Sequence, residues 1–219
     1  MNTKEQFVIT ISREIGSGGH TIACRLAERL GVRFYDKQLI TALMQRFNLT
    51  REQIETLKAQ KKSWMSDFIQ KLNPVPTASL IMGEDSPYTQ PSGIQITTDD
   101  VFKAEAEIIK ALAMESSCVF AGRSGFFILK DCPNKLDIFI TAPRDKRIAR
   151  VMLKQNLPKT EAEELVEAID QSRENYVRRY TGQTRYDLRN YDLCIDVEAL
   201  PDADAVVDLI LDFIRSTDQ

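Results

Sequence analysis

Short runs of β-branched and aromatic residues alternate along this chain with longer stretches in which apolar residues recur every three or four positions. The short runs predict buried strands at residues 7–11, 32–35, 117–121, 136–141 and 191–197. The longer stretches predict amphipathic helices, the first of which places Ile22, Leu26 and Leu30 on one face. Strands that alternate with helices are typical of a parallel sheet with right-handed crossovers. The pattern therefore predicts an α/β fold.

The expected helix ends carry recognisable signals. Gly31 stands where a C-terminal cap of the first helix belongs. Thr160 and Glu163 have the spacing of a capping box, which predicts a long helix from there to about residue 180, ended by Gly182. A similar spacing predicts a helix over about 50–61. Residues 73–98 hold four prolines and two glycines, which predicts a loop.

Composition excludes several classes of protein. The 219 residues include 32 acidic and 29 basic side chains, and a net charge of -3 argues against binding nucleic acid through bulk positive charge. The four cysteines form no CxxC pair and the only histidine is His20, so a zinc site with Cys/His spacing is not expected. A polar start and the lack of a long apolar run predict no membrane contact and a cytoplasmic protein.

A glycine-rich turn lies between the first predicted strand and the first predicted helix. Its residues Gly16, Ser17, Gly18 and Gly19 allow successive backbone N–H groups to point at one spot, next to the positive end of the helix dipole. Arg13, one turn upstream, can bracket the same anion. The turn therefore predicts a phosphate-binding site.

Neither of two familiar phosphate motifs matches this turn in full. A strict P-loop would have glycine at Arg13 and lysine at Gly19. A dinucleotide fingerprint accommodates Gly16 and Gly18 but has Thr21 in place of its third glycine. Asp36, after the second strand, stands where a ribose-binding acid would lie, which keeps a dinucleotide-binding oxidoreductase open as an alternative.

Other candidate residues also follow predicted strands. Asp36, Arg123 and Thr141 come at or just after strand ends, and ligands in parallel sheets bind beyond these carboxyl ends. Arg144, Arg147 and Arg150 recur at three-residue steps in the next helix, which is also compatible with a plain solvated stripe. We therefore expect the ligand at this edge of the sheet.

Four segments, in order, resemble the cytidylate kinase-like proteins, relatives of the nucleoside monophosphate kinases with an altered phosphate loop. The segments are ITISREIGSGGHTIACRLAERLGVRFYDKQLI, AGRSGFFILKDCPN, DQSRENYVRRYTG and NYDLCID. The resemblance implies a single domain with a three-layer α/β/α P-loop kinase fold and a five-stranded parallel sheet. Its core would be residues 6–36, 116–153 and 190–217, with a helical monophosphate-binding insertion at about 37–115 and an Arg-rich lid at about 154–189.

The resemblance also implies roles for individual residues. Those facing the phosphates of ATP would be Gly16, Ser17, Gly18, Gly19, His20 and Thr21. Thr21 would also help to hold Mg²⁺. Those acting in catalysis would be Arg13, Arg147, Asp170 and Arg173, with Arg178, Arg179 and Arg185 as further lid arginines. Asp36 and Arg123 would line the acceptor site.

The resemblance, supported by these residues, implies an ATP-dependent phosphotransferase that moves the γ-phosphate of Mg-ATP to a nucleoside monophosphate such as CMP or dCMP. Its expected partners are small-molecule nucleotides. Because Gly19 replaces the lysine that normally bridges the β- and γ-phosphates, a non-catalytic nucleotide or phosphate sensor on the same fold is the alternative. The Arg-rich lid favours the kinase, since a sensor has little need of several arginines to neutralise the charge of a phosphoryl group during transfer.

Overall fold

The computed structural model of the chain describes residues 1–37 and 98–217. The chain divides into two compact units, Met1–Tyr35 with Ser116–Gln219, and Asp36–Glu115. The second unit contributes helix α5 (Thr98–Glu115). The helix expected over about 50–61 and nearly all of the loop expected at 73–98 lie outside the described residues, as does most of the expected monophosphate-binding insertion.

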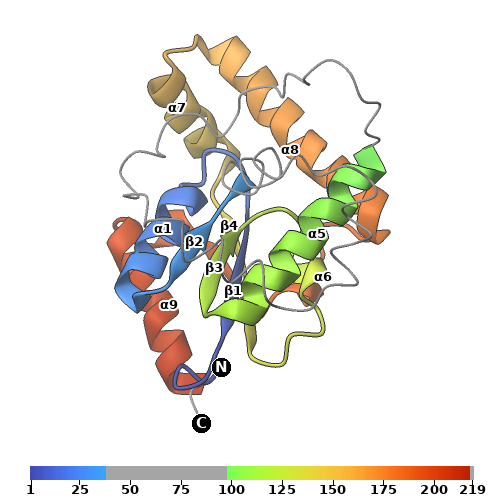
Figure 1. Cartoon of the computed structure of the whole chain (residues 1–219). Helices are drawn as coiled ribbons and strands as arrows, with labels where there is room; N and C mark the ends of the chain where they lie inside the picture. The colour runs from blue at the N-terminus through green and yellow to red at the C-terminus, as the bar shows by residue number, and fades with distance from the viewer. Residues whose placement is uncertain (38–97, 218–219) are drawn as a thin grey trace. The chain divides into compact units, whose positions relative to one another are not determined.

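Five strands of the first unit form one parallel sheet (Figure 1). They are β1 (Val8–Arg13), β2 (Arg33–Tyr35), β3 (Cys118–Ala121), β4 (Lys135–Thr141) and β5 (Leu193–Asp196). Their order is β2-β3-β1-β4-β5, and every neighbouring pair is parallel. The predicted α/β fold with a five-stranded parallel sheet is confirmed.

The strand β1 lies at the centre of the sheet and reaches further than its apolar run. It was expected over 7–11, but its pairing with β4 continues to Arg13, which stands opposite Ile140. Because of this pairing with β4, the polar residues Ser12 and Arg13 belong to the sheet. Arg13 therefore starts from a fixed strand position rather than from a loop.

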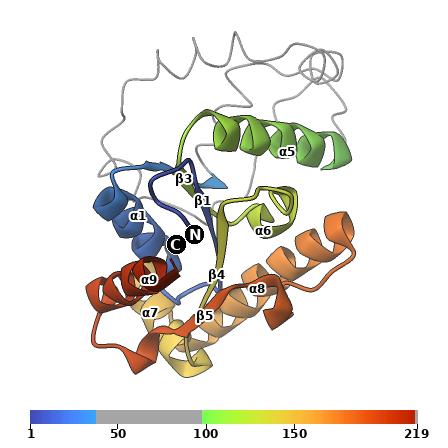
Figure 2. The ribbon, with the colours of Figure 1, turned by 90° about the horizontal axis from the view of Figure 1, so that it is seen from below.

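Helices cover both faces of this sheet. They are α1 (Gly19–Leu30), the short α6 (Gly125–Ile128), α7 (Arg144–Gln155), α8 (Lys159–Thr181) and α9 (Ala203–Thr217), with 3-10 turns η2 (Leu188–Asn190) and η3 (Val197–Ala199). Figure 2 shows α1 and α9 on one face and α6 and α8 on the other, which gives the three layers of the predicted α/β/α arrangement. No helix within residues 1–37 and 98–217 is long and apolar enough to cross a membrane.

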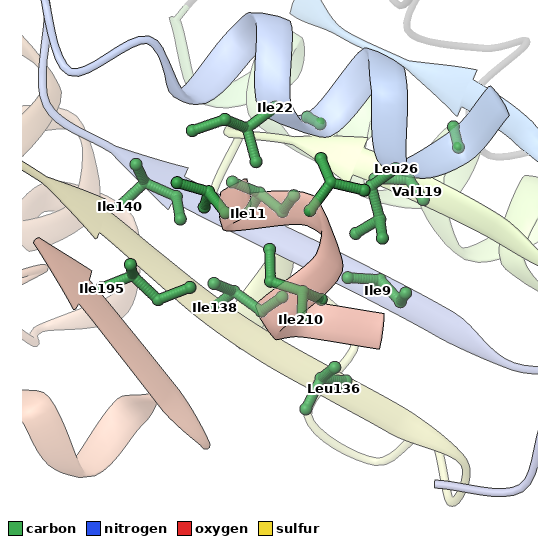
Figure 3. Close-up of a cluster of buried hydrophobic side chains, with 14 of the residues drawn as sticks. Ile9, Ile11, Ile22, Leu26, Val119, Leu136, Ile138, Ile140, Ile195 and Ile210 are labelled. Atoms are coloured by element: carbon green, nitrogen blue, oxygen red, sulfur yellow. The ribbon is translucent and has the colours of Figure 1, made fainter. Parts of the chain in front are cut away.

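The main core lies between the sheet and the α1–α9 layer (Figure 3). Alternate residues of β1 and β4, such as Ile9, Ile11 and Ile138, point to this face because successive strand side chains point to opposite sides. Leu26 of α1 and Ile210 of α9 meet them and are fully buried. This packing fixes α1, and with it the turn that precedes α1.

One predicted helix start is wrong. The capping box placed the start of α8 after Thr160, whereas Pro158 is the N-cap and the helix begins at Lys159 without a side-chain cap. Pro158 has φ of -65° and extended ψ of 158°, and the N–H that proline lacks would make no bond within the helix at this position, so the helix begins directly after it. The predicted C-terminal caps Gly31 and Gly182 are confirmed, with φ of 66° and 69°.

Candidate active site

The turn between β1 and α1 has the backbone conformation that an anion cradle requires. Gly16 and Gly18 have φ of 76° and 79°, in the left-handed region that glycine adopts readily. A Cβ atom at Gly16 would lie 2.9 Å from Cα of Arg147. Gly18 caps α1 without a side-chain hydrogen bond, and the first turn of α1 has no acidic residue. The start of α1 is therefore shaped to receive a negative charge.

Two other residues of the turn have different surroundings. The hydroxyl of Ser17, which is buried, donates to the carbonyl of Glu14 at 2.8 Å and accepts from the N–H of Gly19 at 3.4 Å. Ser17 thus stabilises the turn itself. The ring of His20 meets Phe34 edge-on with 5.3 Å between the ring centres, and Thr21 is exposed in the first turn of α1.

Behind the turn, a buried ion-pair network holds its backbone. The N–H of Ile15 donates to Asp170 at 3.1 Å, and Arg147 donates to the carbonyl of Ile15 at 3.3 Å and to Asp170 at 2.6 Å. Glu14 lies 3.4 Å from Arg147 and accepts from the hydroxyl of Thr141. The carboxylate of Asp170 thus orients the guanidinium of Arg147, and both groups bind the backbone of the turn.

Arg13 is held by hydrogen bonds to its backbone carbonyl, and its side chain packs against two glycines. Its carbonyl accepts hydrogen bonds from Arg173, at 3.1 Å, and from Arg185. Its side chain is buried, starts against Gly19 and ends against Gly122, where a Cβ atom would collide with the guanidinium Nη1. The guanidinium of Arg13 therefore lies beside the turn that follows β3.

That second turn is strained. Gly122, Arg123 and Ser124 are successive residues with φ of 79°, 55° and 54°. For arginine and serine this left-handed conformation costs roughly 1–2 kcal/mol each. Strain of this kind persists where the surrounding structure demands it, and it concentrates at functional sites. The turn holds Arg123 at the carboxyl end of β3.

Arg123 also has an aromatic partner on α8. Its guanidinium donates to the hydroxyl of Tyr176 at 3.0 Å and lies 4.6 Å from the centre of that ring. Burial lowers the pKa of Arg123, Tyr176 opposes this, and the positive charge of Arg13 lowers it further. Burial also raises the pKa of Tyr176 to about 12, so its hydroxyl stays neutral. Two neighbouring guanidinium groups favour an anion beside them.

The sequence did not identify every residue of this site. Tyr176 was missed as a partner of Arg123, although it lies in the predicted lid, because only the fold brings α8 to the end of β3. Of the further lid arginines, Arg185 donates to the carbonyl of Arg13, the last residue of β1. Arg178 instead pairs with Glu174 at 2.5 Å.

Asp36 follows β2 directly and opens the second compact unit, and Asp36 and Arg123 both lie after the carboxyl ends of neighbouring strands. Within the described parts of the chain, no group of three or more His, Cys, Asp or Glu side chains could hold a metal ion.

A cavity of about 460 Å³ lies on the α7–α8 side of the turn. Its charged lining consists of Glu14, Arg144, Arg147, Glu167, Asp170 and Glu174. Because four of these six groups are acidic, the cavity disfavours phosphate. The electrostatics thus favour the Arg13–Arg123 side of the turn for an anion.

A glycine-rich turn joining the first strand and first helix of a parallel sheet of this order defines a P-loop kinase type of fold. The model of one protein family, the cytidylate kinase-like family, matches residues 8–199. The chain belongs to the cytidylate kinase-like family. Family and fold together indicate a kinase-like, nucleotide-binding protein.

Solved structures agree on the fold. An uncharacterised protein from Eubacterium ventriosum ATCC 27560 has 26% identity and a TM-score of 0.66, over 96% of this chain and 99% of that one. Shikimate kinase from Bacteroides thetaiotaomicron has 12% identity and a TM-score of 0.52, over the same shares, which is a likeness in fold alone. No curated protein matches the chain at a significant level.

Proposed function

We propose that this protein is an ATP-dependent phosphotransferase that moves the γ-phosphate of Mg-ATP to a nucleoside monophosphate, CMP, dCMP or a close relative. One observation carries the proposal: two arginines, Arg13 and Arg123, lie next to each other beside a glycine-rich turn at the carboxyl edge of the sheet. A transfer between two phosphates needs positive charge on both the donor and the acceptor side.

The donor site is the turn and the start of α1. Its residues are Gly16, Ser17, Gly18, Gly19, His20 and Thr21. Triphosphate oxygens suit this site because the left-handed glycines and the uncapped helix start direct backbone N–H groups to one place. Mg²⁺ would neutralise charge on the phosphates. The exposed hydroxyl of Thr21 would hold it, which fits an ion that is otherwise bound by phosphate and water.

The acceptor site would be formed by residues that follow the ends of β2 and β3. Arg123 would bind the phosphate of the acceptor, and Asp36 would orient the acceptor. In the reaction, an oxygen of the acceptor phosphate forms the new bond to the γ-phosphorus while the bond to the β–γ bridging oxygen breaks. Arg13 would stabilise the charge of the group in transfer.

The remaining predicted residues support this geometry. Arg173 donates to the carbonyl of Arg13, so its charge lies next to the same turn. Arg147 and Asp170 are positioning residues, because their hydrogen bonds go to the backbone of Ile15. They would keep the N–H groups of the turn aimed at the phosphates.

The test is turnover. Purified protein is mixed with Mg-ATP and each of a panel of ribo- and deoxyribonucleoside monophosphates, and ADP formation is followed. We expect turnover with a pyrimidine monophosphate and a loss of about 10³-fold in kcat for Arg13→Ala. Arg215→Ala is the matched control, since Arg215 is an exposed arginine of α9.

Saturable ATP binding without turnover on any acceptor would contradict the proposal and favour a sensor on the same fold. Tight NADH binding, abolished by Asp36→Ala, would favour the dinucleotide-binding alternative instead.

A further inference from the structure

A side chain at position 19 would collide with Arg13. A Cβ atom built on Gly19 lies 2.6 Å from Cβ and 3.1 Å from Cγ of Arg13, and 3.3 Å from Cβ of Ile140. The first of these distances is too short for two carbon atoms that are not bonded to each other. The φ of Gly19 is not in the left-handed region, so the obstacle is this collision and not the backbone conformation.

Arg13 cannot move aside. It is the last residue of β1 and is paired with Ile140 of β4. Its carbonyl oxygen is bound by both Arg173 and Arg185, and only 8% of the residue is exposed. Relief would have to come from the sheet itself, so an arginine at position 13 excludes any larger residue at position 19.

The other end of the side chain imposes a second restriction. The guanidinium of Arg13 rests against Gly122, where a Cβ atom would meet Nη1 and where φ is +79°. The stem of Arg13 thus passes one glycine and its charged end rests on another. The charge is fixed between the start of α1 and Arg123.

We infer that Arg13, Gly19 and Gly122 form one co-adapted set, in which an arginine at the end of β1 supplies the phosphate-binding charge that a lysine on α1 otherwise supplies. The missing lysine and the added arginine are then one change. The phosphate-binding role of the Arg13 charge rests on the proposed function, whereas the steric coupling between positions 13 and 19 does not. A guanidinium held in this way is preorganised and has a planar fork of donors that suits phosphate oxygens.

The steric part is tested by a mutant cycle on thermal unfolding without ligand. The variants are Arg13→Gly, Gly19→Lys and the double variant. We expect Gly19→Lys to lower Tm strongly, and the double variant to regain most of the loss because the collision is removed. If Gly19→Lys does not fold, Gly19→Ala with and without Arg13→Gly provides the same cycle. Additive effects in the cycle, or a Gly19→Lys variant as stable as the parent, would overturn the coupling.

The charge is tested by titration with tripolyphosphate, which carries no base or sugar. We expect Arg13→Gly to bind it about tenfold more weakly or worse, the double variant to recover most of the affinity, and the control Arg215→Ala to bind normally. Equal affinity of Arg13→Gly and the parent would overturn the inference.

The two proposals can fail separately. If the parent protein binds tripolyphosphate through Arg13 but turns over no acceptor, the proposed function fails and the inference stands. If the parent turns over an acceptor and Arg13→Gly does so equally well, the inference fails and the function stands.

Discussion

At the scale of single residues, the turn after β3 uses strain to aim a side chain. Arg123 and Ser124 adopt a conformation that L-amino acids avoid, and this directs the guanidinium of Arg123 to the edge of the sheet. Tyr176 then fixes the guanidinium by a hydrogen bond and by its ring face. Tyr176 is thus a positioning residue for the proposed acceptor site.

Removing the hydroxyl of Tyr176 should weaken binding of the acceptor and leave binding of ATP unchanged. We expect Tyr176→Phe to raise KM for the monophosphate by about tenfold, the value of one charged hydrogen bond, with KM for ATP unchanged. Because the pKa of Tyr176 is raised to about 12, the ratio between variant and parent should be constant from about pH 6 to 9. Steady-state kinetics against each substrate measure both. Equal changes in the two KM values would show a general distortion of the site.

The contact between the guanidinium of Arg13 and Gly122 gives a second prediction at this scale. Gly122→Ala places a methyl group against the guanidinium of Arg13 and an alanine in a left-handed conformation. We expect turnover to fall as it does in Arg13→Ala, and the double variant to be little worse than either single one, since both remove the same contact. Losses that multiply would contradict the shared role.

At the scale of elements, α8 is more than a cover for the sheet. Its Asp170 accepts from the N–H of Ile15 in the turn after β1, and its Arg173 donates to the carbonyl of Arg13 at the end of β1. Its Glu174 accepts from Arg178 at 2.5 Å and from the N–H of Arg185 at 3.0 Å. Arg185 in turn binds the carbonyl of Arg13. The helix and the segment after it therefore hold the backbone of the end of β1 and of the glycine-rich turn.

The hydrogen bonds of Glu174 make the stability of this region dependent on pH. Burial raises the pKa of Glu174, but hydrogen bonds from Arg178, Thr184 and the backbone of Arg185 outweigh it and leave the pKa lowered. A carboxyl group whose pKa is lowered by folding contributes stability above its unfolded pKa of about 4.3, and the contribution is lost as pH falls through the folded value. Glu174→Gln should thus lower Tm by about 3 °C at neutral pH, for about 1 kcal/mol.

The difference in Tm between Glu174→Gln and the parent should shrink steadily as the pH falls below about 4. Thermal melts across a pH series measure it. A constant difference at every pH would show that the glutamate acts by shape alone.

At the scale of the whole molecule, the core between α9 and the sheet fixes β1 and α1, which carry the candidate site. Ile210 is fully buried against β1 and β4, while its neighbour Leu209 is 40% exposed. Ile210→Ala should cost about 2–5 kcal/mol and lower Tm by roughly 10 °C. Leu209→Ala, the matched control on the same helix, should change the free energy of unfolding by less than about 0.5 kcal/mol. Similar losses in the two variants would contradict the packing of this layer.

The sequence predicted the strands, the glycine-rich turn after β1 and most helix ends because these depend on near neighbours. Gly16 and Gly18 are marked by their place between an apolar run and a helical pattern, and their conformations agree. The start of α8 was missed because Pro158 and Thr160 both signal a start and only tertiary context chooses between them.

Contacts between distant residues could not be predicted in the same way. The bond from Ile15 to Asp170 spans 155 positions, and that from Arg123 to Tyr176 spans 53. Arg144, Arg147 and Arg150 look alike in the sequence. In the fold, Arg144 is exposed, Arg147 is buried against Asp170, and Arg150 binds the carbonyl of Gly16.

The most direct test of the central claim is the chemical identity of the product. Protein, Mg-ATP and the best acceptor of the panel are incubated, and the mixture is analysed by ³¹P NMR. A transfer between two phosphates predicts that the monophosphate resonance of the acceptor disappears and that coupled α and β resonances appear for two nucleoside diphosphates in equal amounts, ADP and the one derived from the acceptor. Release of inorganic phosphate alone, or a new phosphate ester on a hydroxyl group, would contradict it.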